Sequence, residues 1–335
     1  GGEPTGLTVG DFNGDGRVDL ATADFASDTL SVLAGVGDGT LGERSSLLTI
    51  VAPLFVVSGD LDGDGRRDLV TFHRTSGMMV TRLGRGDGTF APQGEVFAGW
   101  PNQVQMADVT NDGRPDLVAA GASGVNVWVG KGDGSFADKL VMEPEHYSNA
   151  ITVADFNTDG RMDVATTHYS NNQVRVLLGN GDGTFTFKQS LPTPGWGFTV
   201  RAADLNADGR VDLVTTFTGA SISDPAWMRV LLGRGDGTFA AGVTLSVPPQ
   251  PGHMELADFT GDGRLDVTFI KEWPGTVSLL PGAGDGTFGT RREFSAGSYP
   301  LALAPADFNG DGRTDLAITR LLGRVSLLLN TCYAP

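Results

Sequence analysis

A nine-residue acidic motif occurs seven times in this chain and constrains its fold more than any other feature of the sequence. The copies start at residues 11, 60, 108, 155, 204, 258 and 307 and read Asp-x-(Asn/Asp/Thr)-x-Asp-Gly-Arg-x-Asp. Successive starts lie 49, 48, 47, 49, 54 and 49 residues apart. A repeat of this length matches one four-stranded blade of a β-propeller. The seven copies predict seven blades, whereas 335 residues alone would suggest two domains.

Each repeat has the same order of short apolar segments and turns. In the fourth copy, residues 150–154 lead into the acidic loop, and residues 164–167 and 174–178 form two further β-branched runs. A turn of the type Gly-x-Gly-Asp-Gly-Thr/Ser follows, and a weaker fourth strand comes after it. We therefore expect an all-β, seven-bladed propeller of four-stranded antiparallel blades over residues 1–335. Its repeats start near residues 7, 55, 103, 150, 199, 253 and 302.

The seventh repeat is shorter than the others. It reaches residues 326–330, where the glycine-rich turn should begin, and the first repeat opens on its first strand at residues 7–9. Rings of this kind are usually sealed by pairing the two ends of the chain in one blade. We expect the missing outer strand to precede Gly1, where it would also offer a partner for Cys332, the single cysteine.

The acidic charge of the chain is concentrated in the motifs. The net charge is −16, and 22 of the 40 carboxylates lie inside the seven copies. Seven divalent cations would bring 14 positive charges and nearly cancel this excess, so the charge indicates metal binding. A strongly acidic chain is a poor partner for nucleic acid or anionic membranes. The sequence also has no apolar run of about 18 residues that could span a membrane.

The motif has the donor pattern of a calcium loop. Side chains at positions 1, 3, 5 and 9, with the carbonyl at position 7, supply hard oxygen ligands around a sharp turn at glycine. The expected side-chain ligands are Asp11, Asn13, Asp15, Asp19; Asp60, Asp62, Asp64, Asp68; Asp108, Thr110, Asp112, Asp116; Asp155, Asn157, Asp159, Asp163; Asp204, Asn206, Asp208, Asp212; Asp258, Thr260, Asp262, Asp266; and Asp307, Asn309, Asp311, Asp315. The expected carbonyl donors belong to Arg17, Arg66, Arg114, Arg161, Arg210, Arg264 and Arg313.

We expect up to seven calcium ions with a structural role, one at each hairpin between the first and second strands. The loops at Thr110 and Thr260 have a weaker third ligand and should bind less tightly. The alternative is a set of Asx-turns without metal. Extracellular sites of this type bind calcium weakly, which predicts a secreted or cell-surface protein.

The repeated acidic motif and the Gly-x-Gly-Asp-Gly-Thr-Phe turn together resemble the FG-GAP/VCBS repeat family. The resemblance covers essentially the whole chain and lies closer to the bacterial VCBS type than to integrin α subunits, because the Gly-Ala-Pro signature is absent. It implies a seven-bladed, integrin-α-like propeller, and some fungal lectins are more remotely similar.

Most of the Trp, Tyr and His residues are expected on the face of the ring opposite the acidic loops. Strand alternation places the acidic loops and the Gly-Asp-Gly turns on one face, and the loops joining strands two to three and four to one on the other. The expected ligand-binding residues on that second face are Trp100, His146, Tyr147, His168, Tyr169, Trp196, Trp227, His253, Trp273 and Tyr299. His73 lies there too, and Trp128 is expected to pack between blades. Tyr and Trp on the loops of a rigid scaffold are typical of a binding surface.

These observations favour a monomeric extracellular module that binds a carbohydrate or a protein surface. One alternative is a polysaccharide-active enzyme, lyase or hydrolase, using residues such as His146, His168, Glu143, Glu145 and Glu272 on the same face. Another is a purely structural or adhesive module of a larger surface protein. Two Arg-Gly-Asp tripeptides, at residues 85–87 and 234–236, are interpreted as variants of the turn sequence.

Overall fold

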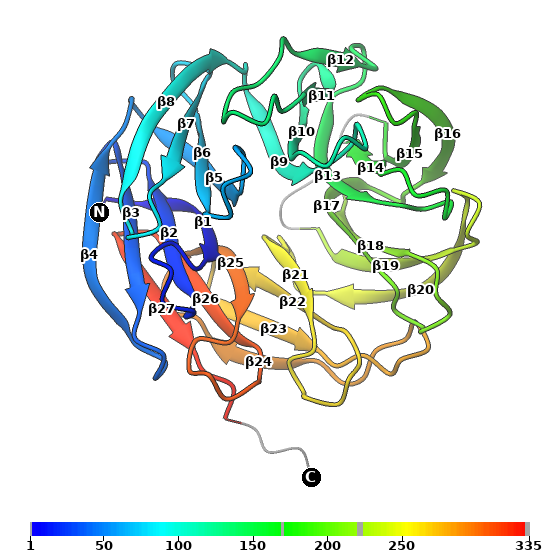
Figure 1. The fold of residues 1–335 in the computed structure, drawn as a ribbon. Coiled ribbons are helices and arrows are strands. Elements are labelled where there is room, and N and C mark those ends of the chain that lie inside the picture. The colour runs from blue at the N-terminus through cyan, green and yellow to red at the C-terminus, as the bar shows by residue number, and fades with distance from the viewer. Residues whose placement is uncertain (1, 169–170, 220–223, 332–335) are drawn as a thin grey trace.

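Seven antiparallel sheets stand side by side around a ring in the computed structural model, which describes residues 2–168, 171–219 and 224–331 (Figure 1). Each sheet is one blade, and the blades follow one another in chain order. The seven-bladed all-β architecture predicted from the repeats is thereby confirmed. In the described part of the chain there is no helix of the length and apolarity that crossing a membrane requires.

The strands of the first four blades have the following bounds. Blade 1 contains β1 (Pro4–Gly10), β2 (Asp19–Asp24), β3 (Thr29–Gly35) and β4 (Leu41–Leu48), and blade 2 contains β5 (Pro53–Gly59), β6 (Asp68–His73), β7 (Met78–Gly84) and β8 (Phe90–Phe97). Blade 3 contains β9 (Pro101–Ala107), β10 (Asp116–Gly121), β11 (Gly124–Trp128) and β12 (Leu140–Met142), and blade 4 contains β13 (Ser148–Ala154), β14 (Asp163–His168), β15 (Gln173–Gly179) and β16 (Phe185–Pro192).

The last three blades continue the pattern until the final strand. Blade 5 contains β17 (Trp196–Ala203), β18 (Asp212–Thr218), β19 (Ala226–Gly233) and β20 (Phe239–Val247). Blade 6 contains β21 (Met254–Ala257), β22 (Asp266–Lys271), β23 (Thr276–Leu280) and β24 (Arg292–Ser295). Blade 7 contains β25 (Pro300–Ala306), β26 (Asp315–Arg320) and β27 (Arg324–Leu328).

The position of each strand in its blade explains its sequence. The first strands lie nearest the centre of the ring and the fourth strands at its rim (Figure 1). Every residue of the second strand β14 is buried because neighbouring blades cover it, and the residues between its terminal Asp163 and His168 are correspondingly apolar or small. No residue of the fourth strand β16 is buried, and most are exposed, which explains why the fourth strand has the weakest sequence signal.

The hydrophobic core is divided among the junctions between blades. The buried apolar residues form seven clusters, and each cluster joins residues from two adjacent blades. Trp128 of blade 3 is fully buried and its ring contacts that of Phe72 in blade 2 at 6.2 Å, so the expected packing between blades is confirmed. A single blade cannot bury both of its faces, and the ring supplies each with a neighbour.

The ring closes by packing of blade 7 against blade 1. Leu20 of β2 and Phe308 and Ala317 of blade 7 form the seventh cluster, with Leu7 and Val325 beside them. Blade 7 has three strands, in agreement with its short repeat, and among the described residues no strand pairs with the outer edge of β27. Cys332 lies outside the described residues, as does any strand before Gly1, so these expectations stay predictions.

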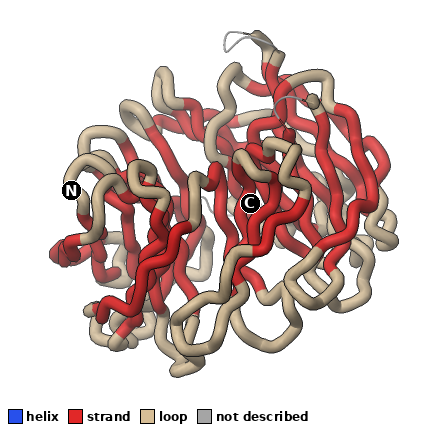
Figure 2. The backbone as a smooth tube through the Cα atoms, turned by 90° about the horizontal axis from the view of Figure 1, so that it is seen from above, coloured by secondary structure: helices blue, strands red, loops and turns tan. Residues whose placement is uncertain are grey.

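Loops cover the two ends of the ring, with the strands between them (Figure 2). The acidic loop of one blade contacts the glycine-rich turn of the next. The amide of Gly237 donates to the carbonyl of Phe156 at 3.1 Å, and equivalent bonds join Gly39 to Phe308 and Gly88 to Phe12. The two loop types therefore share one face, as strand alternation predicted.

Removing an aromatic residue from a junction between blades should destabilise the propeller much more than removing one from an outer strand. Phe156 contacts Phe239 of the next blade edge-on, at 5.4 Å between ring centroids. Phe156→Ala should lower the free energy of unfolding by about 3–5 kcal/mol because it leaves a cavity. Phe187→Ala, at a ring that is 49% exposed, should cost about 1 kcal/mol. Urea denaturation compares the two variants, and equal losses would contradict an inter-blade core.

Candidate functional site

The acidic loops are folded by hydrogen bonds from their own backbone amides. In the fourth loop, the Asp155 carboxylate accepts from Gly160 N at 2.8 Å, and Asp159 accepts from Arg161 N at 2.9 Å. Asn157 Oδ1 accepts from Asp159 N at 3.1 Å. Gly160 has φ +82°, a conformation that favours glycine, which explains its place in every copy of the motif.

The aspartate at position 9 of the motif is buried and links two loops of its blade. Asp163 Oδ2 accepts from Phe156 N and Oδ1 accepts from Gly179 N, both at 2.8 Å. Burial raises the pKa of Asp163 to about 6, although both backbone hydrogen bonds act to lower it. The same pair of bonds is made by Asp19, Asp68, Asp116, Asp212, Asp266 and Asp315. The ninth residue therefore has a structural role that the motif alone did not reveal.

In one acidic loop the carboxylates lie close enough together to hold a divalent cation. In the second loop, carboxylate oxygens of Asp60, Asp62 and Asp68 lie within 4.8 Å of one another. Each carboxylate oxygen can accept more than one interaction, so the backbone bonds leave capacity for a metal. The donors are all oxygen, which suits calcium better than zinc. The arginine side chains of the motif lie beside these carboxylates, as in the 2.8 Å ion pair of Arg161 with Asp159.

The opposite face carries most of the exposed large apolar side chains of the described residues. Eight of the thirteen such residues lie in, or at the ends of, the loops joining strands two to three and four to one: Leu48, Val51, Phe97, Trp100, Tyr147, Trp273, Tyr299 and Leu322. We call these eight residues the apolar rim. Four of them are aromatic residues expected from the sequence. Phe97 and the three aliphatic residues were missed, because nothing in a single loop sequence shows that a Leu or Val is exposed.

Trp100 stands over a cavity between blades 2 and 3. Its side chain is 62% exposed, and its Nε1 donates to the carbonyl of Arg74 at 2.9 Å, which fixes the indole. The cavity beside it has a volume of about 310 Å³ and is also lined by His73 and Asn102. Phe97 contacts Trp100 edge-on at 5.9 Å. A fixed, exposed indole next to polar groups is suited to stacking on a ligand ring.

A second aromatic pair lies at the border of blades 6 and 7. Trp273 in the β22–β23 loop and Tyr299 just before β25 have ring centroids 6.0 Å apart, tilted by 36°. They are 67% and 41% exposed. The ring therefore presents two separate aromatic patches on this face.

The histidines are more buried than the sequence suggested. His168 is fully buried at the end of β14, where its Nε2 lies 2.9 Å from Thr166 Oγ1, and it contacts the half-buried ring of His146 edge-on at 5.8 Å. His73 ends β6 in the same way, 2.9 Å from Thr71 Oγ1. His168 supports this face from below and does not reach its surface, since no part of it is exposed.

His253 ties three blades together beside the centre of the ring. Its Nδ1 accepts from Leu303 N of blade 7 at 2.9 Å, and its Nε2 lies 3.0 Å from Arg201 Nη2 of blade 5. Nε2 faces Glu255 Oε1 at 3.3 Å, and Arg201 of blade 5 pairs with the same oxygen at 2.9 Å. Burial lowers the pKa of His253 to about 4. Both ring nitrogens are engaged within the protein.

Trp227 and Trp196 differ from the expected loop positions. Trp227 belongs to the third strand β19 and stacks on Phe217 at 5.8 Å, and Trp196 is the first residue of β17. Both are only half-exposed because each is part of a sheet. Tyr169 lies outside the described residues, and so does part of the insert at 218–227. Among the described residues, the exposed aromatic side chains of this face are therefore Phe97, Trp100, Tyr147, Trp273 and Tyr299.

A ring of blades with acidic loops at the first hairpin of each blade defines a repeat propeller. The FG-GAP-like repeat matches residues 11–71, 60–119, 108–166, 155–215 and 258–318, and the chain belongs to this family. Each match begins at one acidic motif and ends just after the next copy. The similarity predicted from the motifs is confirmed.

Solved structures with the same fold are distant in sequence. An Agrocybe aegerita lectin that recognises non-reducing terminal N-acetylglucosamine is 22% identical, with 95% of this chain and 85% of that chain covered and a TM-score of 0.63. BBS1N in complex with ARL6DN is 11% identical, covering 100% and 95%, with a TM-score of 0.70. The biofilm matrix protein Bap1 of V. cholerae is 13% identical, covering 99% and 88%, with a TM-score of 0.51. No curated protein matches the chain.

The stability of the protein should fall on acidification, in part through His168. Burial, reinforced by the positive charge of Arg175, lowers the pKa of His168 to about 4. The unfolded chain binds this proton near pH 6.5, so the contribution is complete above that pH and is lost as the pH falls toward 4. At pH 5 the loss is about 2 kcal/mol. His168→Gln should reduce the difference in unfolding free energy between pH 7 and pH 5 by this amount. A variant equally destabilised at both pH values would contradict the assignment.

Proposed function

We propose that the protein is a calcium-stabilised binding module that recognises carbohydrate through the apolar rim. The observation that carries the proposal is the placement of exposed aromatic side chains on the face opposite the acidic loops. The repeated loops hold the blades together, and the residues that depart from the repeat contact the ligand. A surface of this kind suits a secreted or cell-surface protein.

Trp100 and the Trp273–Tyr299 pair are the proposed contact points. The flat indole of Trp100 would stack on a sugar ring, while the cavity beside it offers hydrogen-bonding groups of Asn102 and Arg74. Two patches on one rigid ring would allow a branched or repeating glycan to bind at more than one point. The lectin among the structures of similar fold supports a carbohydrate ligand, at a level of similarity that concerns the fold alone.

A protein surface is the second candidate. Leu48 is 80% exposed and Leu322 is 76% exposed, and aliphatic side chains contribute little to sugar stacking. They do suit the apolar centre of a protein interface. BBS1N, which shares the fold, is seen in complex with a protein.

Calcium is proposed to occupy the acidic loops and to stabilise the ring. At about 2 mM calcium, a site with a dissociation constant on the order of 10⁻⁴–10⁻³ M contributes about 1 kcal/mol. Chelation should therefore lower the melting temperature by several degrees, and added calcium should restore it. Asp60→Ala, in the loop with four carboxylates, should reduce the number of ions bound in a calorimetric titration by one. An unchanged melting curve in excess chelator would refute the proposal.

Glycan binding should depend on the exposed aromatics. A glycan array followed by calorimetry on the best ligand should identify a carbohydrate, and Trp100→Ala or Trp273→Ala should weaken its binding at least tenfold. Phe187→Ala, at an exposed residue of the outer strand β16 of blade 4, is the matched control and should bind normally. If no glycan binds, or if both tryptophan variants bind like the parent, carbohydrate recognition by this face is wrong.

A further inference from the structure

Two arginines lie side by side in blade 7 without an acidic partner. Arg320 ends β26 and Arg324 begins β27, and the two residues are paired directly across the hairpin. Residues paired in this way have their side chains on the same face of the sheet, where two like charges repel each other. Among the described residues, no carboxylate forms an ion pair with either arginine. The pair therefore concentrates positive charge in a chain whose net charge is −16.

Arg320 differs from the other arginines that are buried or half-buried in the described part of the chain. Its Nε is buried, and no hydrogen bond or ion pair joins its guanidinium to another described residue. The other five each have at least one such partner: Arg82, Arg175, Arg201, Arg229 and Arg313. A buried donor that lacks an acceptor is costly, so this guanidinium is suited to an acceptor from outside the chain.

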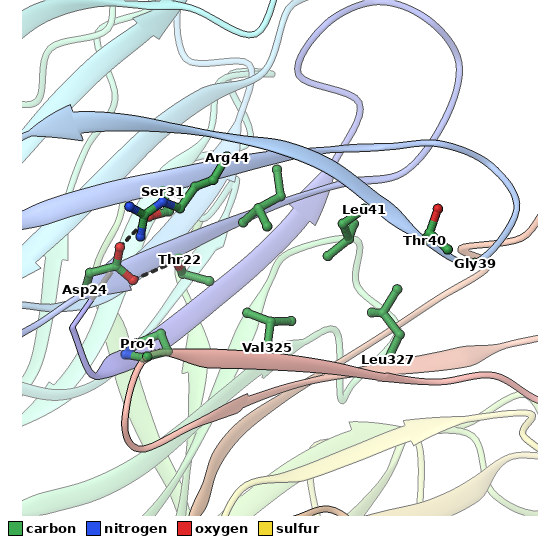
Figure 3. A pocket seen from close by; sticks show the side chains of 12 residues that line it. Pro4, Thr22, Asp24, Ser31, Gly39, Thr40, Leu41, Arg44, Val325 and Leu327 are labelled. Carbon is green, nitrogen blue, oxygen red and sulfur yellow. Dashed lines mark hydrogen bonds between the residues drawn. The ribbon is translucent and has the colours of Figure 1, made fainter.

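The equivalent residue of blade 1 shows why Arg320 has no partner in its own sheet. Asp24 ends β2 and accepts hydrogen bonds from Thr22 Oγ1 at 2.9 Å and from Ser31 (Figure 3). In blade 7, Ile318 takes the place of Thr22 and has no polar group to offer. The end of β26 therefore carries a charged side chain without the hydroxyl support that the end of β2 has.

Both arginines face the junction between blades 6 and 7. Ile318 lies two residues before Arg320, on the same side of β26, and belongs to the hydrophobic cluster of that junction. Leu328 lies four residues after Arg324, on the same side of β27, and packs against the same cluster. The aromatic pair of Trp273 and Tyr299 stands at this junction too, so the charges and the rings share one part of the ring of blades.

The backbone around the aromatic pair also contacts the end of β26. The guanidinium of Arg320 packs against Gly297, two residues before Tyr299, and leaves no room there for a side chain. The Trp273 loop packs on the same segment, because Gly275 lies against the backbone of residues 297 and 298. The amide of the residue after Arg320 donates to the carbonyl of Tyr299 at 3.0 Å. Two exposed rings and a guanidinium without a partner are thus held next to one another.

We propose that Arg320, Arg324, Trp273 and Tyr299 form a site for a sugar that carries a carboxylate, as a uronic acid does. We call these four residues the arginine site. The inference rests on the proposed carbohydrate-binding function and names the class of sugar for one of its two patches. The rings stack on the face of the pyranose, and the planar guanidinium of Arg320 matches both oxygens of the carboxylate. The bound anion also offsets the repulsion between Arg320 and Arg324.

The aromatic pair favours an acidic sugar over an acidic peptide. A peptide carboxylate could pair with Arg320 equally well, but aspartate and glutamate side chains have no flat ring to lie against Trp273 and Tyr299. In a uronic acid the carboxylate is bonded directly to the sugar ring, so one monosaccharide supplies both the stacking surface and the charge. The arginine site requires both within a short distance.

Matched pairs of oligosaccharides test the proposal. Oligomers of galacturonic acid and of glucuronic acid are compared, by isothermal titration calorimetry at one calcium concentration, with the same oligomers after reduction of every carboxylate to an alcohol. At least one acidic oligomer should bind about tenfold more tightly than its reduced form, as a hydrogen bond to a charged group predicts. Its affinity should fall as the salt concentration rises, whereas that of the reduced form should not.

Protein variants locate the effect. Arg320→Gln should lower the affinity for the acidic oligomer to that of the reduced form and leave the reduced form unaffected. Arg320→Lys should keep part of the preference, because it retains the charge but loses the two-point geometry. The matched control is Arg234→Gln, which removes an exposed arginine from a glycine-rich turn on the opposite face and should change neither affinity. If Arg320→Gln does not fold, Arg324→Gln, at an exposed residue, should still weaken binding of the acidic oligomer alone.

The outcomes separate this inference from the proposed function. Equal affinities for the acidic and reduced oligomers, with both still dependent on Trp273, would overturn the arginine site and leave carbohydrate recognition intact. Failure of every oligomer to bind would count against both. A preference for the acidic form that survives in Arg320→Gln and Arg324→Gln would overturn the inference, as would tighter binding of a glutamate-rich peptide or a sulfated oligosaccharide than of any uronic acid oligomer.

Discussion

The buried aspartate at the end of each acidic motif is the interaction on which the rest of the ring depends. Asp163 binds one backbone amide in its own loop and one in the glycine-rich turn. It therefore fixes the hairpin between strands one and two relative to the hairpin between strands three and four. The glycine-rich turn also contacts the acidic loop of the preceding blade, because the amide of Gly183 donates to the carbonyl of Val109. A single side chain, repeated seven times, thus sets both the shape of a blade and its contact with a neighbour.

This arrangement explains why the motif is so regular. A carboxylate placed in the interior is costly, and burial raises the pKa of Asp163 to about 6. Two amide donors compensate for part of that cost, and a cation beside Asp155 and Asp159 would compensate for more. Replacement of the aspartate by an apolar residue would leave two buried backbone amides without their acceptor. The motif is constrained by architecture before any ligand is considered.

Much of this architecture could be predicted because short sequence patterns that recur in every blade specify it. The period, the acidic loops and the glycine-rich turns place each strand by sequence distance alone, and Asn330 is the last residue that follows the pattern. The candidate binding face was harder to predict because exposure is a property of the assembled ring. Trp100 and Trp273 lie on that face as expected, but Trp227 stacks within a sheet and His168 is buried beneath neighbouring strands. An aromatic side chain near a loop can point into solvent or pack within a sheet, and the packing of the assembled ring determines which.

Departures from the repeat are of two kinds. Substituted loops, as at Trp100 and Trp273, add exposed side chains to a face that is otherwise rigid. In the described part of blade 7 there are three strands where the other blades have four, and cavities lie beside Phe259 and Val325. The regular repeats supply the rigid frame on which the substituted loops place their exposed side chains.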